Sequence, residues 1–272
     1  MKIPVALRLP LALVAIVSCS FLATKWQGSS SEIDTTAKSG PMAEGLGSDL
    51  PQDPIDRITF YNSLFTEIKP SDRVAQILTS DPNTWVKDSL EYALSWARET
   101  ENSALAALLM ADLADHFGDS SNHTEVARNL VFSAAENIDI PTASAFLFQQ
   151  GKIWIDRGLE KNPKDIDLRN ALIIYQSEYL NAPMQFLGTL RETLAMDSSN
   201  IETHFIHLNL LKKSQQWQKA LDKCQKLVSL QPQNPFWLYQ TSDLYGFLGD
   251  STNAKIFLDL AVKAQRTQNQ TN

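Results

Sequence analysis

The sequence predicts an all-α protein built as an array of helical hairpins, and three observations support this fold class. Apolar residues recur at i, i+3, i+4 and i+7 from Asp53 onward, which is the pattern of amphipathic helices. Only 10 glycines and 12 prolines occur, and no stretch shows the sustained alternation typical of strands. Matching helix ends also recur after 35 and then 34 residues, so consecutive hairpins share one design.

The apolar periodicity and the turn signals between periodic segments give the expected helix boundaries. We expect helices at residues 54–66, 70–79, 83–100, 102–117, 122–138, 141–160, 166–180, 183–196, 201–213, 217–230, 235–248 and 251–266.

Three matching helix ends carry the repeat. Asp165, Asn200 and Asn234 each close a short polar turn, and they stand 35 and 34 residues apart. Pro163 and Pro232 stand in two of these turns, where proline ends the preceding helix. A turn that ends one helix and opens the next produces the hairpins of a stacked array.

This period and several residues resemble the tetratricopeptide repeat (TPR) family. In the last unit Ser242 and Ala254 stand where the family has small residues, and Gly249 stands at its turn. Two positions depart from the family: Leu208 and Phe186 stand where it prefers small side chains. The departures predict wider or tilted packing at these places.

The resemblance is closest over residues 166–266, looser over 122–165 and weak over 53–121. One residue more than the family's 34 is present around residues 181–183. The predicted segments are 1–24, a signal anchor or lipoprotein signal; 25–52, a flexible linker; 53–121, helical hairpins capping the array; 122–266, TPR-like repeats; and 267–272, a polar tail.

The N-terminal segment has the form of an export signal. Lys2 and Arg8 precede an apolar run at residues 9–23, and a polar stretch follows it. Residues 16–19, Ile-Val-Ser-Cys, resemble a bacterial lipobox, in which Cys19 is lipidated. The alternative is an uncleaved signal anchor, although residues 9–23 alone would span only ~22 Å as a helix.

Both alternatives tether the protein to a membrane and place its body outside the cytoplasm. The body would then stand on the periplasmic side of a bacterial inner membrane, or belong to an envelope lipoprotein. Residues 25–52 are rich in Ser, Gly, Thr and Asp and nearly free of bulky apolar side chains, which favours a flexible spacer.

Composition argues against several classes of function. The formal net charge of −7 makes nucleic acid a poor partner, because an acidic surface repels phosphates. Glycine-rich phosphate loops and GxSxG nucleophile elbows are absent from the sequence. We therefore expect no catalytic residues, no enzyme activity and no cofactor.

Candidate metal ligands are too few or wrongly spaced. His204 and His207 lie on one predicted helix without a third ligand, so we interpret them as part of a polar helix face. Asp112, Asp115 and Asp119 lack the spacing of a calcium loop and are interpreted as a solvated helix face and its turn. We expect no metal site.

Cys224 is the only cysteine beyond the N-terminal segment and falls on an apolar helical face. We interpret it as a small buried hydrophobe.

The TPR resemblance implies a concave groove lined by the first helix of each hairpin, and such grooves bind peptides or partner helices. Carried over by position, the partner-binding groove comprises Asn170, Ile174, Phe205, Asn209, Lys212, Phe236, Tyr239 and Asp243. Phe205 and Phe236 have an alternative role, which is packing between repeats.

The expected function is therefore a membrane-tethered scaffold or adaptor that binds protein or peptide partners. The alternative is a structural envelope protein that associates with itself or contacts the cell wall.

Overall fold

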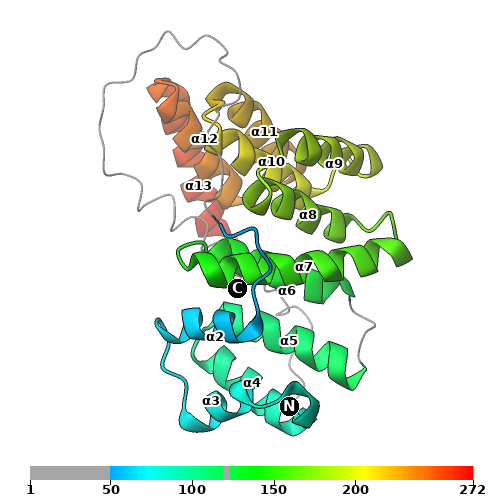
Figure 1. The fold of residues 1–272 in the computed structure, drawn as a ribbon. Helices are drawn as coiled ribbons and strands as arrows, with labels where there is room; N and C mark the ends of the chain where they lie inside the picture. Colours follow the sequence, from blue (N-terminus) through cyan, green and yellow to red (C-terminus); the bar gives the residue numbers. More distant parts are fainter. Residues whose placement is uncertain (1–49, 119–122, 272) are drawn as a thin grey trace. The chain divides into compact units, whose positions relative to one another are not determined.

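All regular secondary structure in the described part of the chain is helical, as the periodicity predicts (Figure 1). The computed structural model describes residues 50–118 and 123–271. The predicted export signal, Cys19 and most of the predicted linker lie outside these ranges. Within them, no helix combines the length and the apolar character needed to cross a membrane.

The described residues form two compact units, which divide between Asn181 and Ala182. The helices of the first unit are α2 (Arg57–Phe65), α3 (Asp72–Thr79), the 3-10 turn η2 (Pro82–Thr84), α4 (Lys87–Glu99), α5 (Ser103–Phe117), α6 (His123–Glu136), α7 (Pro141–Lys161), α8 (Ile166–Ile174) and the π turn η3 (Tyr175–Tyr179). Those of the second unit are α9 (Pro183–Met196), α10 (Ile201–Lys213), α11 (Trp217–Leu230), α12 (Pro235–Phe247) and α13 (Ser251–Thr271).

Several helix boundaries differ from the sequence-based expectation for local reasons. The helix expected to begin at residue 54 begins at Arg57, because the Asp56 side chain caps it there. The helix expected at residues 83–100 is split, because the Asp81 side chain caps η2 and the chain is extended at Trp85 before α4 begins. The helix expected to end at residue 266 continues to Thr271, since no glycine or proline interrupts the sequence there.

The residues that carry the 34–35-residue repeat are the N-caps of three helices. The side chains of Asp165, Asn200 and Asn234 accept hydrogen bonds from backbone N–H groups in the first turns of α8, α10 and α12. Each cap satisfies one of the N–H groups that have no partner within the helix. The periodic turn signals in the sequence are thus helix starts.

The extra residue between the helix caps Asp165 and Asn200 is absorbed in a π turn. In η3 the Leu180 N–H donates to the Tyr175 carbonyl oxygen at 3.2 Å, five residues back. A bond across five residues takes up one residue more than an α-helical bond. The sequence located this insertion at residues 181–183; there the structure has Asn181 with φ of 47°, just after the π turn.

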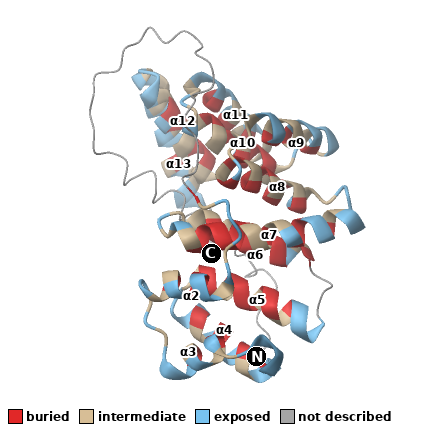
Figure 2. Ribbon diagram, in the orientation of Figure 1, coloured by how far each residue is buried: buried red, intermediate tan, exposed pale blue. Residues whose placement is uncertain are grey.

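Helix α7 is the centre of the first unit and packs against α2, α6 and α8. Its buried residues run along most of its length (Figure 2). Two glycines allow close approach by its neighbours. A Cβ at Gly151 would lie 2.7 Å from Val131 Cγ2 on α6, and one at Gly158 would lie 2.5 Å from Leu168 Cδ1 on α8.

The second unit stacks its helices in sequence order, with contacts between α10 and α11, α11 and α12, and α12 and α13. The Ser242 hydroxyl donates to the Ala254 carbonyl oxygen at 2.7 Å, so these two small residues face each other across the last hairpin. Cys224 is fully buried, which confirms its interpretation as a hydrophobe. Burial raises the pKa of its thiol to about 11.

We expect Gly151→Ala to destabilise the first unit by about 1–3 kcal/mol, because the added methyl group overlaps a β-branched valine that has little freedom to move. Urea unfolding followed by circular dichroism measures the change. Gly188→Ala on α9 is the matched control: nothing lies within 4 Å of its added Cβ. The control should gain about 0.5–1 kcal/mol from helix propensity. Equal effects of the two substitutions would contradict the close approach of α6 and α7.

Candidate functional site

The residues of the predicted groove divide between the two units. Asn170 and Ile174 lie on α8 in the first unit, and both are buried. They are packing residues of that unit, since neither presents a sizeable surface to solvent. The others lie on α10 and α12 in the second unit, where most are partly exposed.

A polar surface is formed on α10 and α12, and we call it the α10–α12 surface. Its members are Asn209, Lys212, Phe236, Tyr239, Gln240 and Asp243. Lys212 Nζ donates to Gln240 Oε1 at 2.8 Å, which links the two helices. Gln240 is not among the residues of the predicted groove, although it lies one turn after Phe236 and therefore on the same side of α12.

Burial and charge shift the pKa values of Lys212 and Asp243 in opposite directions, and burial has the larger effect on both. Burial lowers the pKa of Lys212, and the nearby Asp243 carboxylate opposes this. Burial raises the pKa of Asp243, and the Lys212 charge opposes that change. Asp243 itself is an exposed residue, so a charged group of this surface is open to a partner.

The aromatic residues at this surface serve packing as well as exposure. Phe205 is buried and contacts Phe236 and Trp237, with ring centroids 5.9 and 5.4 Å away. These contacts join α10 to α12, as the packing alternative predicts. Tyr239 is half-buried, and its hydroxyl donates to Gln265 Oε1 of α13 at 2.9 Å. The Tyr239 side chain therefore bridges α12 and α13, the two helices of its own hairpin.

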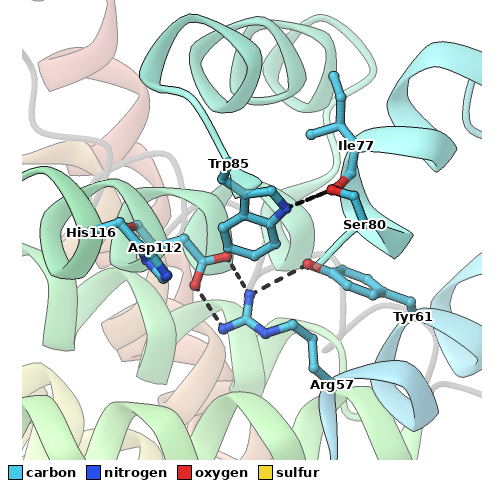
Figure 3. A network of polar contacts seen from close by, with 7 residues as sticks. All are labelled: Arg57, Tyr61, Ile77, Ser80, Trp85, Asp112 and His116. Carbon is cyan, nitrogen blue, oxygen red and sulfur yellow. Dashed lines mark hydrogen bonds and ion pairs between the residues drawn. The ribbon is translucent and has the colours of Figure 1, made fainter. Parts of the chain in front are cut away.

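An ion pair of the first unit joins α2 to α5 (Figure 3). The Arg57 guanidinium binds both carboxylate oxygens of Asp112, with Nη2 2.7 Å from Oδ1. Asp112 is only 4% exposed, so its interpretation as part of a solvated helix face was wrong. Its partner lies 55 residues earlier in the chain, which explains why the local sequence did not reveal it.

Aromatic residues surround this ion pair. Arg57 lies over the Trp85 ring, 5.2 Å from its centroid, and the Trp85 N–H donates to the Ile77 carbonyl and the Ser80 hydroxyl. His116 Nδ1 lies 3.0 Å from the Asp112 carbonyl oxygen. The charges are balanced within the network, which is the arrangement of a buried structural pair.

An open cavity of about 510 Å³ adjoins the ion pair. It is lined by Asp56, Arg57, Ile58, Tyr61, Leu78, Thr79, Ser80, Asp81 and Pro82. The Arg57 cation on its wall is already neutralised by Asp112, so the cavity presents no free charge from that group.

A smaller cavity of about 240 Å³ lies between α10 and α11. It is lined by His207, Leu211, Lys219, Asp222 and Lys223. His207 Nδ1 is buried there without a hydrogen-bond partner. Burial, reinforced by Lys223 and His204, lowers the pKa of His207 to about 4.

The neighbouring His204 is buried, so its interpretation as part of a polar helix face was wrong. Its Nε2 donates to the Ser198 carbonyl at 2.9 Å, and its Nδ1 lies 3.4 Å from Lys223 Nζ. Across the described ranges, no three His, Cys, Asp or Glu side chains gather as metal ligands.

Comparison with known proteins assigns no family. No protein-family model matches the chain, and no curated protein matches its sequence. Among solved structures, MamA residues 41 to the end from Desulfovibrio magneticus RS-1 match at 14% identity and a TM-score of 0.45, covering 70% of this chain and 98% of that one. MamA MSR-1 matches at 14% identity and a TM-score of 0.41, covering 67% and 98%. At these values no function is carried from MamA to this chain.

We expect the free energy of unfolding to fall as the pH is lowered from 6.5 towards about 4, in part because of His207. Its folded-state pKa lies below that of the unfolded chain, so in this range only the unfolded chain binds the proton. The contribution is roughly 1–2 kcal/mol for a partly buried group. Urea unfolding of the wild type and of His207→Gln across this range measures it. The variant should show the shallower pH dependence, and parallel curves would contradict the assignment.

Proposed function

We propose that this protein is a non-catalytic interaction scaffold that binds protein or peptide partners through the α10–α12 surface. The proposal rests on one combination of side chains. Helices α10 and α12 together present half-buried aromatic rings, an amide, and a lysine close to an exposed carboxylate. Aromatic residues are frequent hot spots of protein interfaces, and amides pair with main-chain groups.

Lys212 and Asp243 favour a polar partner on this surface. Lys212 is partly desolvated and donates to an uncharged amide rather than to a carboxylate. A partner that offers a carboxylate or a main-chain carbonyl would give it a second acceptor. Asp243 would in turn accept from the partner's N–H groups.

We further propose that residues 1–24 tether the scaffold to a membrane and that the body lies outside the cytoplasm. Lys2 and Arg8 before the apolar run support an export signal, and the residues around Cys19 support lipidation. The spacer predicted for residues 25–52 would hold the body away from the bilayer.

A second candidate function is self-association, and helix α13 favours it. Ile256 and Leu260 lie one turn apart on this last helix and are 49% and 45% exposed, whereas terminal helices of repeat arrays usually turn a polar face outward. A second copy of the chain could cover these side chains. Sedimentation over a range of protein concentrations decides, since a monomer throughout would exclude this function.

Identification of the partner is the first experiment. A photo-crosslinking residue at Asp243 should capture it, while the same residue at Asp88 on α4 is a control at another exposed carboxylate position. Mass spectrometry of the adducts from membranes then names the partner. Equal adducts at both positions would argue against the α10–α12 surface.

With the partner in hand, we expect Tyr239→Ala combined with Asn209→Ala to weaken binding by at least ~2 kcal/mol, or about 30-fold, while helical content is retained. Tyr245→Ala is the matched control, because this tyrosine is on the same helix but stacks on Phe257 of α13. Titration calorimetry and thermal unfolding are measured on the same preparations. Unchanged binding by the folded double variant would remove the α10–α12 surface from the function.

Cys19→Ser distinguishes the two tethers. A lipoprotein should lose both acyl-chain labelling and membrane retention, whereas a signal anchor should keep its retention. Metabolic labelling with an alkyne fatty acid, followed by membrane fractionation, reads out both properties. A chain without residues 1–24 that still pellets with membranes would contradict the tether altogether.

A further inference from the structure

Residues 50–55 cross the first unit as a non-helical segment, which we call the strap. It leads directly into α2, whose N-cap is Asp56. Leu50 at its start is buried, although the sequence placed residues 50–52 in the linker. Prolines at positions 51 and 54 fix one dihedral angle each and bias the preceding residues towards extended conformations.

The strap is held mainly through its main chain. The Tyr179 hydroxyl donates to the Pro51 carbonyl at 2.9 Å. Gln149 Nε2 donates to the Asp53 carbonyl at 2.8 Å, and Gln149 Oε1 accepts from the Ile55 N–H at 3.1 Å. The groups used are two residues apart, which is the spacing at which an extended chain repeats on one side.

The two binding residues are held in place by their own contacts. Gln149 Nε2 also donates to the Tyr179 hydroxyl at 2.9 Å. The Tyr179 ring is only 3% exposed and stacks on Phe148 of α7, with centroids 5.6 Å apart. Neither the Gln149–Tyr179 hydrogen bond nor the stacking on Phe148 involves the strap, so these contacts hold the amide and the hydroxyl in place and reduce the entropy lost on binding.

The end of η3 supplies a fourth hydrogen bond to the strap. The Tyr179 carbonyl belongs to the last turn of the helix, where carbonyl groups lack helical partners. Gln52 Nε2 donates to it at 3.1 Å. This is a side-chain contact, so a glutamine at this place in the peptide adds specificity to the main-chain recognition.

We propose that Gln149 and Tyr179 form a binding site for the main chain of an extended peptide, and that the chain's own strap occupies it in this structure. The ligand is an extended peptide segment that has a main-chain N–H at the position of Ile55 and a glutamine at the position of Gln52. The site contains no residue of the α10–α12 surface, so it does not rest on the function proposed above.

We expect the strap and a peptide added in trans to compete for this site. The tethered strap has a high effective concentration, which makes an added peptide bind weakly to the wild type. Ile55→Pro combined with Gln52→Ala removes the strap's N–H donor and its amide but leaves Gln149 and Tyr179 intact. The Pro51 and Asp53 carbonyl contacts remain, so the strap of this full-length variant should hold the site more weakly, and we call it the vacated variant.

The test is fluorescence anisotropy with a labelled synthetic peptide of residues 48–57. We expect it to bind the vacated variant at least about tenfold more tightly than the wild type. Adding Gln149→Ala should abolish the gain, whereas Gln150→Ala should not, since this neighbouring glutamine makes none of these hydrogen bonds. Circular dichroism checks that each variant is folded.

Two altered peptides test the recognition itself. Methylation of the Ile55 nitrogen should abolish binding because the donor to Gln149 is lost. Replacement of Asp53 by alanine should leave binding within about twofold, since only its carbonyl is used. Failure of the unmodified peptide to bind the folded vacated variant, or binding that survives N-methylation, would overturn the proposal.

Discussion

The close packing of helices against α7 is the constraint on which the first unit depends. Gly151 and Gly158 offer no side chain, so α6 and α8 approach the helix at distances that a Cβ would not permit. Helix α2 packs against the same helix. Since Gln149 is also on α7 and Tyr179 stacks on Phe148 beside it, the geometry that holds the strap follows from this packing.

Polar groups buried within the units pair both with residues far away in sequence and with nearby main-chain groups. The negative charge of Asp112 is compensated by Arg57, which binds both of its oxygens. His204 donates a hydrogen bond to the Ser198 carbonyl just before α10. A distant pair such as Arg57 and Asp112 stabilises one arrangement of helices, because any other arrangement would leave the buried Asp112 without its partner. His207 Nδ1 is the exception beside these examples, and its lowered pKa follows from that burial.

Much of the fold could be predicted because its signals are local. An N-cap such as Asp165 or Asn200 acts within three residues, so the helix starts are readable from the sequence. The extra residue was counted correctly, but its location at Tyr175–Tyr179 depends on how these tyrosines pack against α7. Packing of that kind has no local signature.

The candidate sites were less predictable for the same reason. Periodicity places Phe205 and Phe236 on facing helices, and the structure brings their rings together. It does not reveal that Tyr239 bonds to Gln265, or that Gln149 meets a segment 94 residues earlier. Both contacts join elements whose pairing is decided by the whole unit. The assignment of the groove to partner binding stays a prediction.

The strap also decides where mechanical load would enter the protein. A chain pulled from its N-terminal end transmits tension first to residues 50–55, and through their hydrogen bonds to Gln149 and Tyr179. The load then reaches the centre of the first unit before it reaches α2. Release of these few bonds would lengthen the slack by about 20 Å, at ~3.3 Å for each extended residue. The strap is thereby the first described segment to carry such a load, ahead of α2.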